Sequence, residues 1–428
     1  MLDYLKKKFY QLIPISLQQK LKTFILLVYG RMRLWLPIYR IEKNGLTVVL
    51  IGRKSHDPYF VHLLYGDYAD NQKVGNTAVW NINKTIQYWE KRSDIILFRD
   101  NGFQPSEAIM QRMFTIPYYV TQTAKLPPVD SDLLASFRDL STTSNLSKIR
   151  KAGFEYHISN DSAQLEHFYH WMYKPFILSR HRDSARIPGW PSFKRIHENM
   201  ELLLISREGE LVAGALNLQT GNSYTGYANG VLNADKKLIK DGVVSAIYWF
   251  GIVEAHRRGC STVNLGTSRP FLKDGVLAYK KKWGGQIIID ENEPEFRLLA
   301  CGNQLAAQRF FEAMPFVCQH DNNLVSLVFL GQRVELNDKD LSSYLRACLF
   351  QGDHLSTWIV LLSPEWVARR EIIQSIVRGF VTSTRIIDLS KGSLAELPPQ
   401  IYDLARTHES STQSSLFCRV ITRLRLAY

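Results

Sequence analysis

In the first third of the chain, hydrophobic residues recur with two different spacings. Some segments have the alternating spacing of strands, and others have the spacing of three to four residues typical of amphipathic helices. The pattern predicts strands at 46–52, 59–66, 94–98 and 118–123 and helices at 81–92 and 106–114. Strands and helices that follow one another in this way indicate an α/β layer. The proline-rich segment 125–132 then breaks the pattern and predicts a domain boundary near residue 130.

A second block with mixed elements follows this break. A helix that ends at Gly153 leads into a strand that ends near residue 159, and residues 161–181 are again helical in pattern. Residues 200–232 read as a meander of three strands, because short turns separate three apolar runs. The long apolar segment 243–259 predicts a helix with a basic last turn, followed by a strand at 262–266.

The two ends of the chain differ from these blocks. Residues 356–390 predict one strand–helix–strand unit within a C-terminal extension, 331–428. Residues 1–40 hold eight Lys or Arg and one acidic residue, with apolar residues at helical spacing. Such basic amphipathic helices lie on an anionic membrane surface or dock on the protein's own body, and the pattern leaves both open. The expected domains are therefore 1–40, 41–130, 131–330 and 331–428.

Composition narrows the class of protein. The chain of 428 residues is 45% hydrophobic and carries a formal charge of +13, which favours an anionic partner but is also compatible with a generally basic surface. Its five cysteines form no C-x-x-C pair, so we expect reduced thiols, no cysteine-rich metal site and a cytoplasmic location. No apolar run reaches the roughly 18 residues of a membrane span, so any membrane contact would be peripheral, through residues 1–40 at the inner face.

The segment 266–285, GTSRPFLKDGVLAYKKKWGG, carries the densest candidate chemistry. Asp274 is placed to cap a helix from about residue 275 to 283, on which Tyr279, Lys280 and Trp283 share one face. Arg269, held by the following proline, comes at the carboxyl end of a strand, where open α/β sheets bind ligands. Arg269 and Lys280 could together hold an anionic group, or the arginine could simply fix a loop beside a solvated lysine helix.

Two stretches of this sequence resemble the FemAB and CelD-like branch of the GNAT acyltransferase superfamily. The first is residues 241–285, where a helix with a basic end, a strand that closes on glycine, a loop and a Tyr-Lys-x-Lys-Trp-Gly helix follow one another. The second is the segment 145–159 with its Lys-x-Arg-Lys-Ala run. The resemblance implies tandem GNAT-like domains with mixed, largely antiparallel sheets, an α/β (α+β) fold.

The activity implied by this resemblance is transfer of an acyl group to an amine or hydroxyl of a bacterial cell-envelope or exopolysaccharide precursor. Acyl-CoA would be a co-substrate, and no bound cofactor is expected. In such enzymes the acceptor attacks the donor directly, so no nucleophile triad is needed, and the sequence contains no convincing one. Positioning, a base and donors to the developing oxyanion would do the work.

The resemblance also suggests where the donor binds. GNAT strands splay to admit the pantetheine arm, and the strand with Tyr227 and Asn229 falls where this opening is expected, although its glycines could merely relieve packing. The start of the following helix, with Gly242 and Ser245, could hold a phosphate. The glycine-rich phosphate loop of the family is missing there, which leaves aminoacyl-tRNA, the donor of Fem-type relatives, as an alternative.

Candidates for a general base are Asp241, Asp274 and His181. The arginine-rich loop 179–190, which contains Arg186, is long enough for a lid and could bind an anionic sugar or peptide acceptor. A third hypothesis is a non-catalytic GNAT-fold partner of a polysaccharide synthase that sits on the membrane through residues 1–40.

Overall fold

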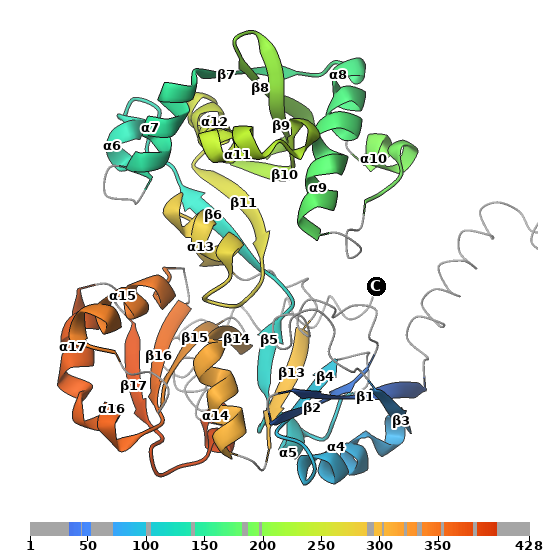
Figure 1. The fold of residues 1–428 in the computed structure, drawn as a ribbon, viewed down its shortest axis with the longest axis vertical. Helices are drawn as coiled ribbons and strands as arrows, with labels where there is room; N and C mark the ends of the chain where they lie inside the picture. The colour runs from blue at the N-terminus through green and yellow to red at the C-terminus, as the bar shows by residue number, and fades with distance from the viewer. Residues whose placement is uncertain are drawn as a thin grey trace, which may run out of the picture. The chain divides into compact units, whose positions relative to one another are not determined.

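The computed structural model (Figure 1) describes residues 34–399 except 44, 53–71, 100–103, 138–141, 182–186, 197–198, 289–294, 302–303, 321–322, 332–335, 352–354 and 380–382. The described chain forms two compact units. Unit 1 takes the residues up to Ile116, Pro294–Phe310 and those from Gly392, and unit 2 takes Pro117–Glu293 and Phe311–Lys391. This division differs from the ranges expected from the sequence, because each unit is assembled from separate stretches of chain.

Unit 1 is built on a six-stranded sheet in the order β3-β1-β2-β4-β13-β5. Its strands are β1 (Trp35–Lys43), β2 (Leu46–Ile51), β3 (Gln72–Ala78), β4 (Ile95–Arg99), β5 (Phe114–Pro117) and β13 (Glu295–Ala300). Its helices are η2 (Val79–Asn81), α4 (Ile82–Glu90), α5 (Glu107–Met110) and η6 (Leu394–Glu396). The helix α4 buries Ile82 and Ile86 in the core of this unit, which fixes the opposite side of the helix toward solvent.

The expectation of helices throughout residues 1–40 is wrong for its last part. Residues 35–40 belong to β1, in which Leu36 and Ile38 are buried at alternate positions and Ile38 pairs with Ile51 of β2. Alternation of this kind fits a pleated strand, and the sheet partner overrides the helical reading. The helix expected nearer the N-terminus and the strand expected at 59–66 lie outside the described residues.

Unit 2 contains a seven-stranded sheet in the order β12-β6-β11-β10-β9-β8-β7 (Figure 1). Its strands are β6 (Val120–Lys125), β7 (Phe154–Ser159), β8 (Glu201–Arg207), β9 (Glu210–Thr220), β10 (Ser223–Val231), β11 (Thr262–Ser268) and β12 (Gln286–Ile288). Neighbouring strands are antiparallel except β10 and β11, which are parallel. The predicted α/β class with largely antiparallel sheets is confirmed, and β6 joins this sheet from before the expected boundary at residue 130.

Helices cover both faces of the seven-stranded sheet. They are α6 (Leu133–Ser136), α7 (Thr143–Ala152), α8 (Ser162–His167), the π-helix η3 (Phe168–Tyr173), α9 (Lys174–His181), α10 (Trp190–Ile196), η5 (Leu232–Ala234), α11 (Lys236–Asp241), α12 (Val243–Arg257) and α13 (Gly275–Lys282). Because strand side chains alternate, Leu203 packs in a core with α12, whereas Leu202 packs in a second core with η3 and α10.

Unit 2 also holds a four-stranded sheet in the order β14-β15-β16-β17. Its elements are β14 (Phe316–His320), β15 (Asn323–Leu330), β16 (Leu355–Leu361), β17 (Thr384–Asp388), α15 (Asp338–Cys348), α16 (Pro364–Ala368) and α17 (Arg370–Arg378). The helix α14 (Gln304–Ala313) begins in unit 1 and ends in unit 2, because the division falls between Phe310 and Phe311. The strand–helix–strand unit predicted here is present, with β16 and β17 parallel. Its core includes Leu272, Leu277 and Ile287, so this sheet packs directly on the segment around α13.

Neither a membrane span nor a metal cluster occurs in the part of the chain that the structure describes. None of its helices combines the length and the apolar character needed to cross a bilayer. No group of three or more His, Cys, Asp and Glu side chains lies together as metal ligands among these residues. The four described cysteines are buried and free.

Gly230 of β10 lies against the backbone of η3, and this contact supports a stability prediction. A Cβ atom on Gly230 would lie 2.6 Å from the backbone nitrogen of Tyr173 and 2.7 Å from the carbonyl carbon of Met172. We expect Gly230→Ala to lower the stability of unit 2 by about 1–3 kcal/mol, because strand and π-helix must move apart. Chemical denaturation measures the effect.

Gly251→Ala serves as the matched control for this substitution. Gly251 lies inside α12, and a Cβ atom there meets no atom within 4 Å. Since alanine is preferred to glycine in a helix by roughly 0.5–1 kcal/mol, this variant should be as stable as the parent or more so. Equal destabilisation by both alanines would contradict the proposed close approach at Gly230.

Candidate functional site

The parallel strands β10 and β11 form a fork in the middle of the sheet. They are paired only from Ser223 to Thr225 of β10, opposite Thr262 to Asn264 of β11. Directly after the paired part, β10 is bulged between Gly226 and Ala228, and the register of β11 with β6 shifts between Asn264 and Thr267. Bulges bend strands and increase their twist, which explains why the two strands separate here.

Gly266 gives the fork its local geometry. Its φ of 79° lies in the left-handed region that favours glycine, and its N–H donates to Oδ1 of Asn264 over 2.8 Å. A Cβ atom on Gly266 would lie 3.5 Å from the carbonyl oxygen of Gly226 and 3.6 Å from Nζ of Lys280. The amine of Lys280 therefore sits at the point where β10 and β11 part.

Lys280 is a buried amine, which is unusual for lysine. The residue is only 4% exposed, and its Nζ donates to the carbonyl oxygen of Thr267 over 2.7 Å. Burial lowers the pKa of Lys280 to about 8, although the carboxylate of Asp274 acts in the opposite direction. Lys280 is thus mostly protonated near pH 7 and presents a poorly solvated positive charge to the fork.

The helix α13 holds this amine in place through contacts at its start and along its side. Asp274 caps the helix, since its Oδ1 accepts hydrogen bonds from the backbone N–H groups of Val276 and Leu277. Gln122 of β6 donates to the carbonyl oxygen of Leu277 and accepts from the hydroxyl of Ser268. Figure 1 shows α13 beside β6 and β11, the two strands that it contacts.

Tyr279 and Ser245 connect α13 to the first turn of α12. Their hydroxyl oxygens lie 2.7 Å apart, and Tyr279 packs edge-on against Tyr248 and Trp283. Burial raises the pKa of Tyr279, so its hydroxyl stays protonated at neutral pH. The pair brings one hydroxyl group of α12 and one of α13 together.

The start of α12 differs from an open phosphate-binding helix end. Gly242, with φ of 101°, both ends α11 and begins α12, so the two helices follow each other directly. A Cβ atom on Gly242 would contact the side chain of Lys148 at 3.3 Å. The lysines of α11 that flank this junction, Lys236, Lys237 and Lys240, are exposed.

The loop between β11 and α13 is clamped by β14 of the four-stranded sheet. The carbonyl oxygen of Pro270 accepts from the N–H of Val317 over 2.8 Å, and the N–H of Leu272 donates to Pro315 over 2.9 Å. Lys281 does not face the fork, because its Nζ donates to the carbonyl oxygen of Arg346 at the end of α15. Arg269, which is partly buried, begins this clamped loop.

The other residues singled out in the sequence are dispersed. Asp241 forms an ion pair of 3.0 Å with Arg207 and therefore already has a structural partner. Tyr227 at the β10 bulge is 54% exposed, and Asn229 is partly buried. The side chain of His181 lies outside the described set, as does Arg186 with the loop 182–186.

Sequence reasoning missed three residues that shape the fork: Gln122, Asn264 and Thr267. Gln122 is completely buried and bonds to both α13 and β11, but it lies in a strand that the sequence placed in another domain. Asn264 and Thr267 look like ordinary strand residues, and only the bulge between them reveals their role. The local sequence gives no signal for Gln122, because β6 reads VTQTAK and its burial depends on the sheet.

No protein-family model matches this chain, and no curated protein matches it significantly. Solved structures with a similar arrangement include the C-terminal domain of a putative lysylphosphatidylglycerol synthetase from Agrobacterium fabrum. It is 12% identical with a TM-score of 0.30 over 64% of this chain and 83% of that one. L-PGS from Bacillus licheniformis is 10% identical with a TM-score of 0.33, over 64% and 84% of the two chains.

FemX is a third solved structure of this kind, 14% identical with a TM-score of 0.32 over 64% of this chain and 85% of that one. At scores this low the similarities do not decide what the chain does.

Proposed function

We propose that unit 2 is an acyltransferase that moves an acyl group from an activated ester to an amine or hydroxyl. The observation that carries this proposal is the fork between β10 and β11 with the buried amine of Lys280 at its apex. Beyond Thr225, β10 has no pairing with β11 in the described structure. Its backbone groups on that side are available to an amide-bearing donor arm, as at the edge of a sheet.

Lys280 supports the chemistry that such a fork needs. When the acceptor attacks the acyl carbonyl, a new C–N or C–O bond forms and negative charge develops on the carbonyl oxygen. A protonated amine in a poorly solvated site stabilises this charge strongly, because a low dielectric strengthens the interaction. The bond to the leaving thiolate or alkoxide then breaks, and the proton given up by the acceptor passes to this leaving group or to solvent. No covalent intermediate with the protein is required.

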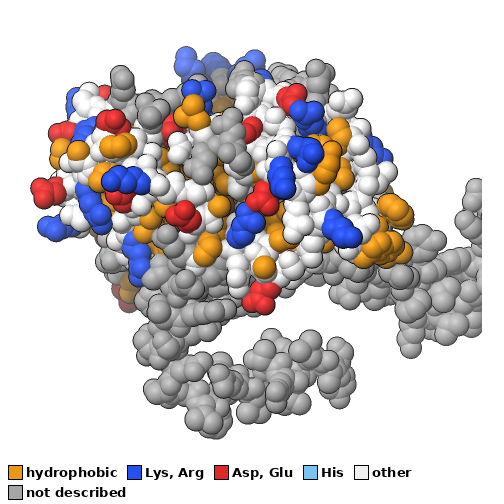
Figure 2. Space-filling model, turned by 90° about the horizontal axis from the view of Figure 1, so that it is seen from below, with side chains coloured by type: hydrophobic (Ala, Val, Ile, Leu, Met, Phe, Trp, Pro, Cys, Tyr) orange, Lys and Arg blue, Asp and Glu red, His pale blue; other side chains and the backbone are white. Residues whose placement is uncertain are grey.

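The donor that we favour is acyl-CoA, whose thioester arm is long and carries amides that suit the free edge of β10. The second candidate donor is aminoacyl-tRNA, and it is favoured by the closed junction of α11 and α12 with its exposed lysines. On the face that Figure 2 presents, basic side chains lie among acidic and hydrophobic ones, so the described residues there make no unbroken basic strip.

The two donors are separated by binding experiments on the full chain. We expect acetyl-CoA to raise the melting temperature of unit 2 in a concentration-dependent way, since a ligand that binds only the native state stabilises it. Lys280→Met should lose most of this protection. If a charged tRNA binds instead, with an affinity that falls steeply with salt, the donor changes but the transferase proposal stands.

If neither donor protects the protein against unfolding, the acyltransferase proposal is wrong. The non-catalytic alternative, a membrane-associated partner of a polysaccharide synthase, would then be favoured if deletion of residues 1–33, which leaves β1 intact, abolished membrane association. For the acceptor we propose an anionic sugar or peptide precursor of the cell envelope, because the chain is strongly basic. Identification by mass spectrometry of small molecules that copurify with the protein tests this choice.

A further inference from the structure

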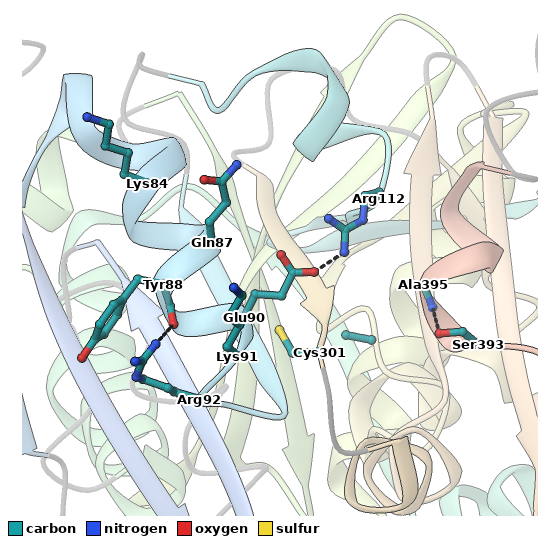
Figure 3. Close-up of a pocket in the computed structure, with 11 residues that line it drawn as sticks. Lys84, Gln87, Tyr88, Glu90, Lys91, Arg92, Arg112, Cys301, Ser393 and Ala395 are labelled. Atoms are coloured by element: carbon teal, nitrogen blue, oxygen red, sulfur yellow. Dashed lines mark hydrogen bonds and ion pairs between the residues drawn. The ribbon is translucent and has the colours of Figure 1, made fainter.

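Unit 1 contains a pocket of about 770 Å³ beside α4, within the usual size range of small-molecule sites. Its lining is Lys84, Gln87, Tyr88, Glu90, Lys91, Arg92, Arg112, Ala300, Cys301, Ser393 and Ala395. Figure 3 shows that most of the polar lining comes from α4 and the turn after it, with Arg112 opposite. Four of these side chains are cationic and one is a carboxylate, so the pocket carries a net charge of +3.

The single carboxylate in the pocket lining already has an ionic partner. Glu90 forms an ion pair with Arg112, drawn as a dashed line in Figure 3. Lys84 and Lys91 are exposed, and neither has a carboxylate partner among the described residues. Since like charges gathered in a hollow repel one another, the arrangement favours an anion that enters from solvent.

Arg92 is held toward the same pocket by Tyr88. Its Nη1 donates to the carbonyl oxygen of Tyr88 over 3.0 Å, and its guanidinium lies 4.0 Å from the centre of the Tyr88 ring. A guanidinium fixed in this way loses less side-chain freedom when it binds an anion. The floor includes Ala300 and Cys301, and burial raises the pKa of the Cys301 thiol to about 12, so the floor adds no charge.

The spacing of the cations distinguishes a long anion from a small one. Lys84 lies in α4 and Lys91 directly follows its last residue, so the two are seven residues apart, about 10 Å along the helix axis at about 1.5 Å per residue. A single phosphate ion would contact only one end of this row. A chain of phosphate groups would meet Lys84, Lys91 and Arg92 together.

We propose that this pocket of unit 1 binds an extended anion that carries two or more phosphate groups. Phosphate chemistry fits because Arg and Lys are its usual partners, and Arg92 offers the planar, fork-like donor set that phosphate oxygens accept. The site lies in unit 1 and does not depend on the acyl transfer proposed for unit 2. Such an anion is either free in solution or displayed by phospholipid headgroups at a membrane surface.

Calorimetric titration of the full chain with inorganic tripolyphosphate tests the proposal. We expect binding that is at least about tenfold tighter than that of orthophosphate at the same ionic strength, and that weakens with salt. The double variant Lys84→Glu with Lys91→Glu should weaken it at least tenfold. Both lysines are exposed, so the variant should keep the melting temperature of the parent.

A charge-matched control separates this site from the general basic character of the chain. Lys73→Glu with Lys151→Glu changes the net charge equally at exposed lysines on β3 and α7, away from the pocket lining. This control variant should bind tripolyphosphate with an affinity within about twofold of the parent's, because only long-range electrostatic interactions change. Equal weakening by both double variants would overturn the proposal.

Vesicles identify the source of the phosphate groups. If tripolyphosphate does not bind but equimolar phosphatidylglycerol and phosphatidylcholine vesicles do, and only Lys84→Glu with Lys91→Glu reduces this binding, the ligand is a row of lipid headgroups. If tripolyphosphate binds with the expected pattern, the ligand is a soluble phosphate ester or anhydride. Absence of binding to both probes would overturn the proposal.

Discussion

Replacement of Lys280 by methionine is expected to lower the turnover of acyl transfer by about 100-fold or more while the protein stays folded. Loss of one donor to a developing oxyanion typically costs 10²–10³-fold in rate. Methionine fills a similar volume in the buried site and removes the charge at the apex of the fork. Steady-state kinetics with the donor that protects unit 2 against thermal unfolding measures the effect.

The pH profile of the proposed acyl transfer by the parent protein gives a second readout for Lys280. Burial lowers its pKa to about 8, so the protonated form needed to stabilise the oxyanion is lost as the pH rises through 8. We therefore expect kcat/KM to fall above about pH 8. A profile that instead rises through pH 8 would assign the neutral amine a role as base and contradict the electrophilic role.

Stability should depend on pH through the same group. In the unfolded chain a lysine keeps its proton up to its ordinary pKa of 10.5, whereas folded Lys280 loses it near 8. The unfolded state therefore binds more protons between pH 8 and 10.5, and the stability of unit 2 should rise with pH in this window. Lys280→Met should abolish this rise.

Lys282→Met is the matched control for both experiments. Lys282 lies on the same helix two residues further on, and its side chain is exposed. Its removal should change turnover by less than about twofold, because a solvated charge is screened. The rise in stability between pH 8 and 10.5 should remain. Loss of activity in both variants would show that α13, and not the buried amine, is what the reaction needs.

The second large effect is expected at Glu254, the acid at the end of α12 that is only 1% exposed. Its carboxylate accepts hydrogen bonds from Arg257, from Arg258 and from the hydroxyl of Tyr156. Arg258 also pairs with Glu201 over 2.9 Å. This network ties the end of α12 to β7 and β8.

Glu254→Gln is expected to destabilise unit 2 by about 3–5 kcal/mol, as when one partner of a buried ion pair is removed. The partly buried guanidinium of Arg258 would lose one of its two carboxylates. Chemical denaturation followed by far-UV circular dichroism measures the loss. Glu166→Gln, at an exposed position of α8, should stay within about 0.5 kcal/mol of the parent and controls for the change of side chain.

The same carboxylate should contribute to acid sensitivity. Burial by itself would raise the pKa of Glu254, but the hydrogen bonds from Arg257 and Arg258 outweigh it and lower the pKa to about 2. The stabilisation, roughly 3 kcal/mol at about 1.4 kcal/mol per pKa unit, is present above pH 4.5 and lost as the pH falls toward 2. A parent and a Glu254→Gln variant that lose stability in parallel over this range would contradict the assignment.

Most local elements of unit 2 could be predicted from the sequence. The helix that ends at Gly153, the meander of β8 to β10, the long helix α12 and the cap at Asp274 all appear where the pattern indicates. These features depend on residues close together in the chain, such as a glycine with φ of 66° after α7. Burial of Lys280 was not predictable, since a lysine with two lysine neighbours on a short helix usually points to solvent.

The sequence by itself determined the class of fold, the order of elements in unit 2 and the segment 266–285 as the place with the most chemistry. The tertiary structure decided which strands are neighbours: β6 joins the sheet from 146 residues away to bind Ser268 through Gln122. It also decided that bulges in β10 and β11 open a fork and that β14 clamps the loop before α13. Helix caps and turns are local interactions, whereas strand partners, register and desolvation of an amine are set by contacts between distant segments, which no local pattern encodes.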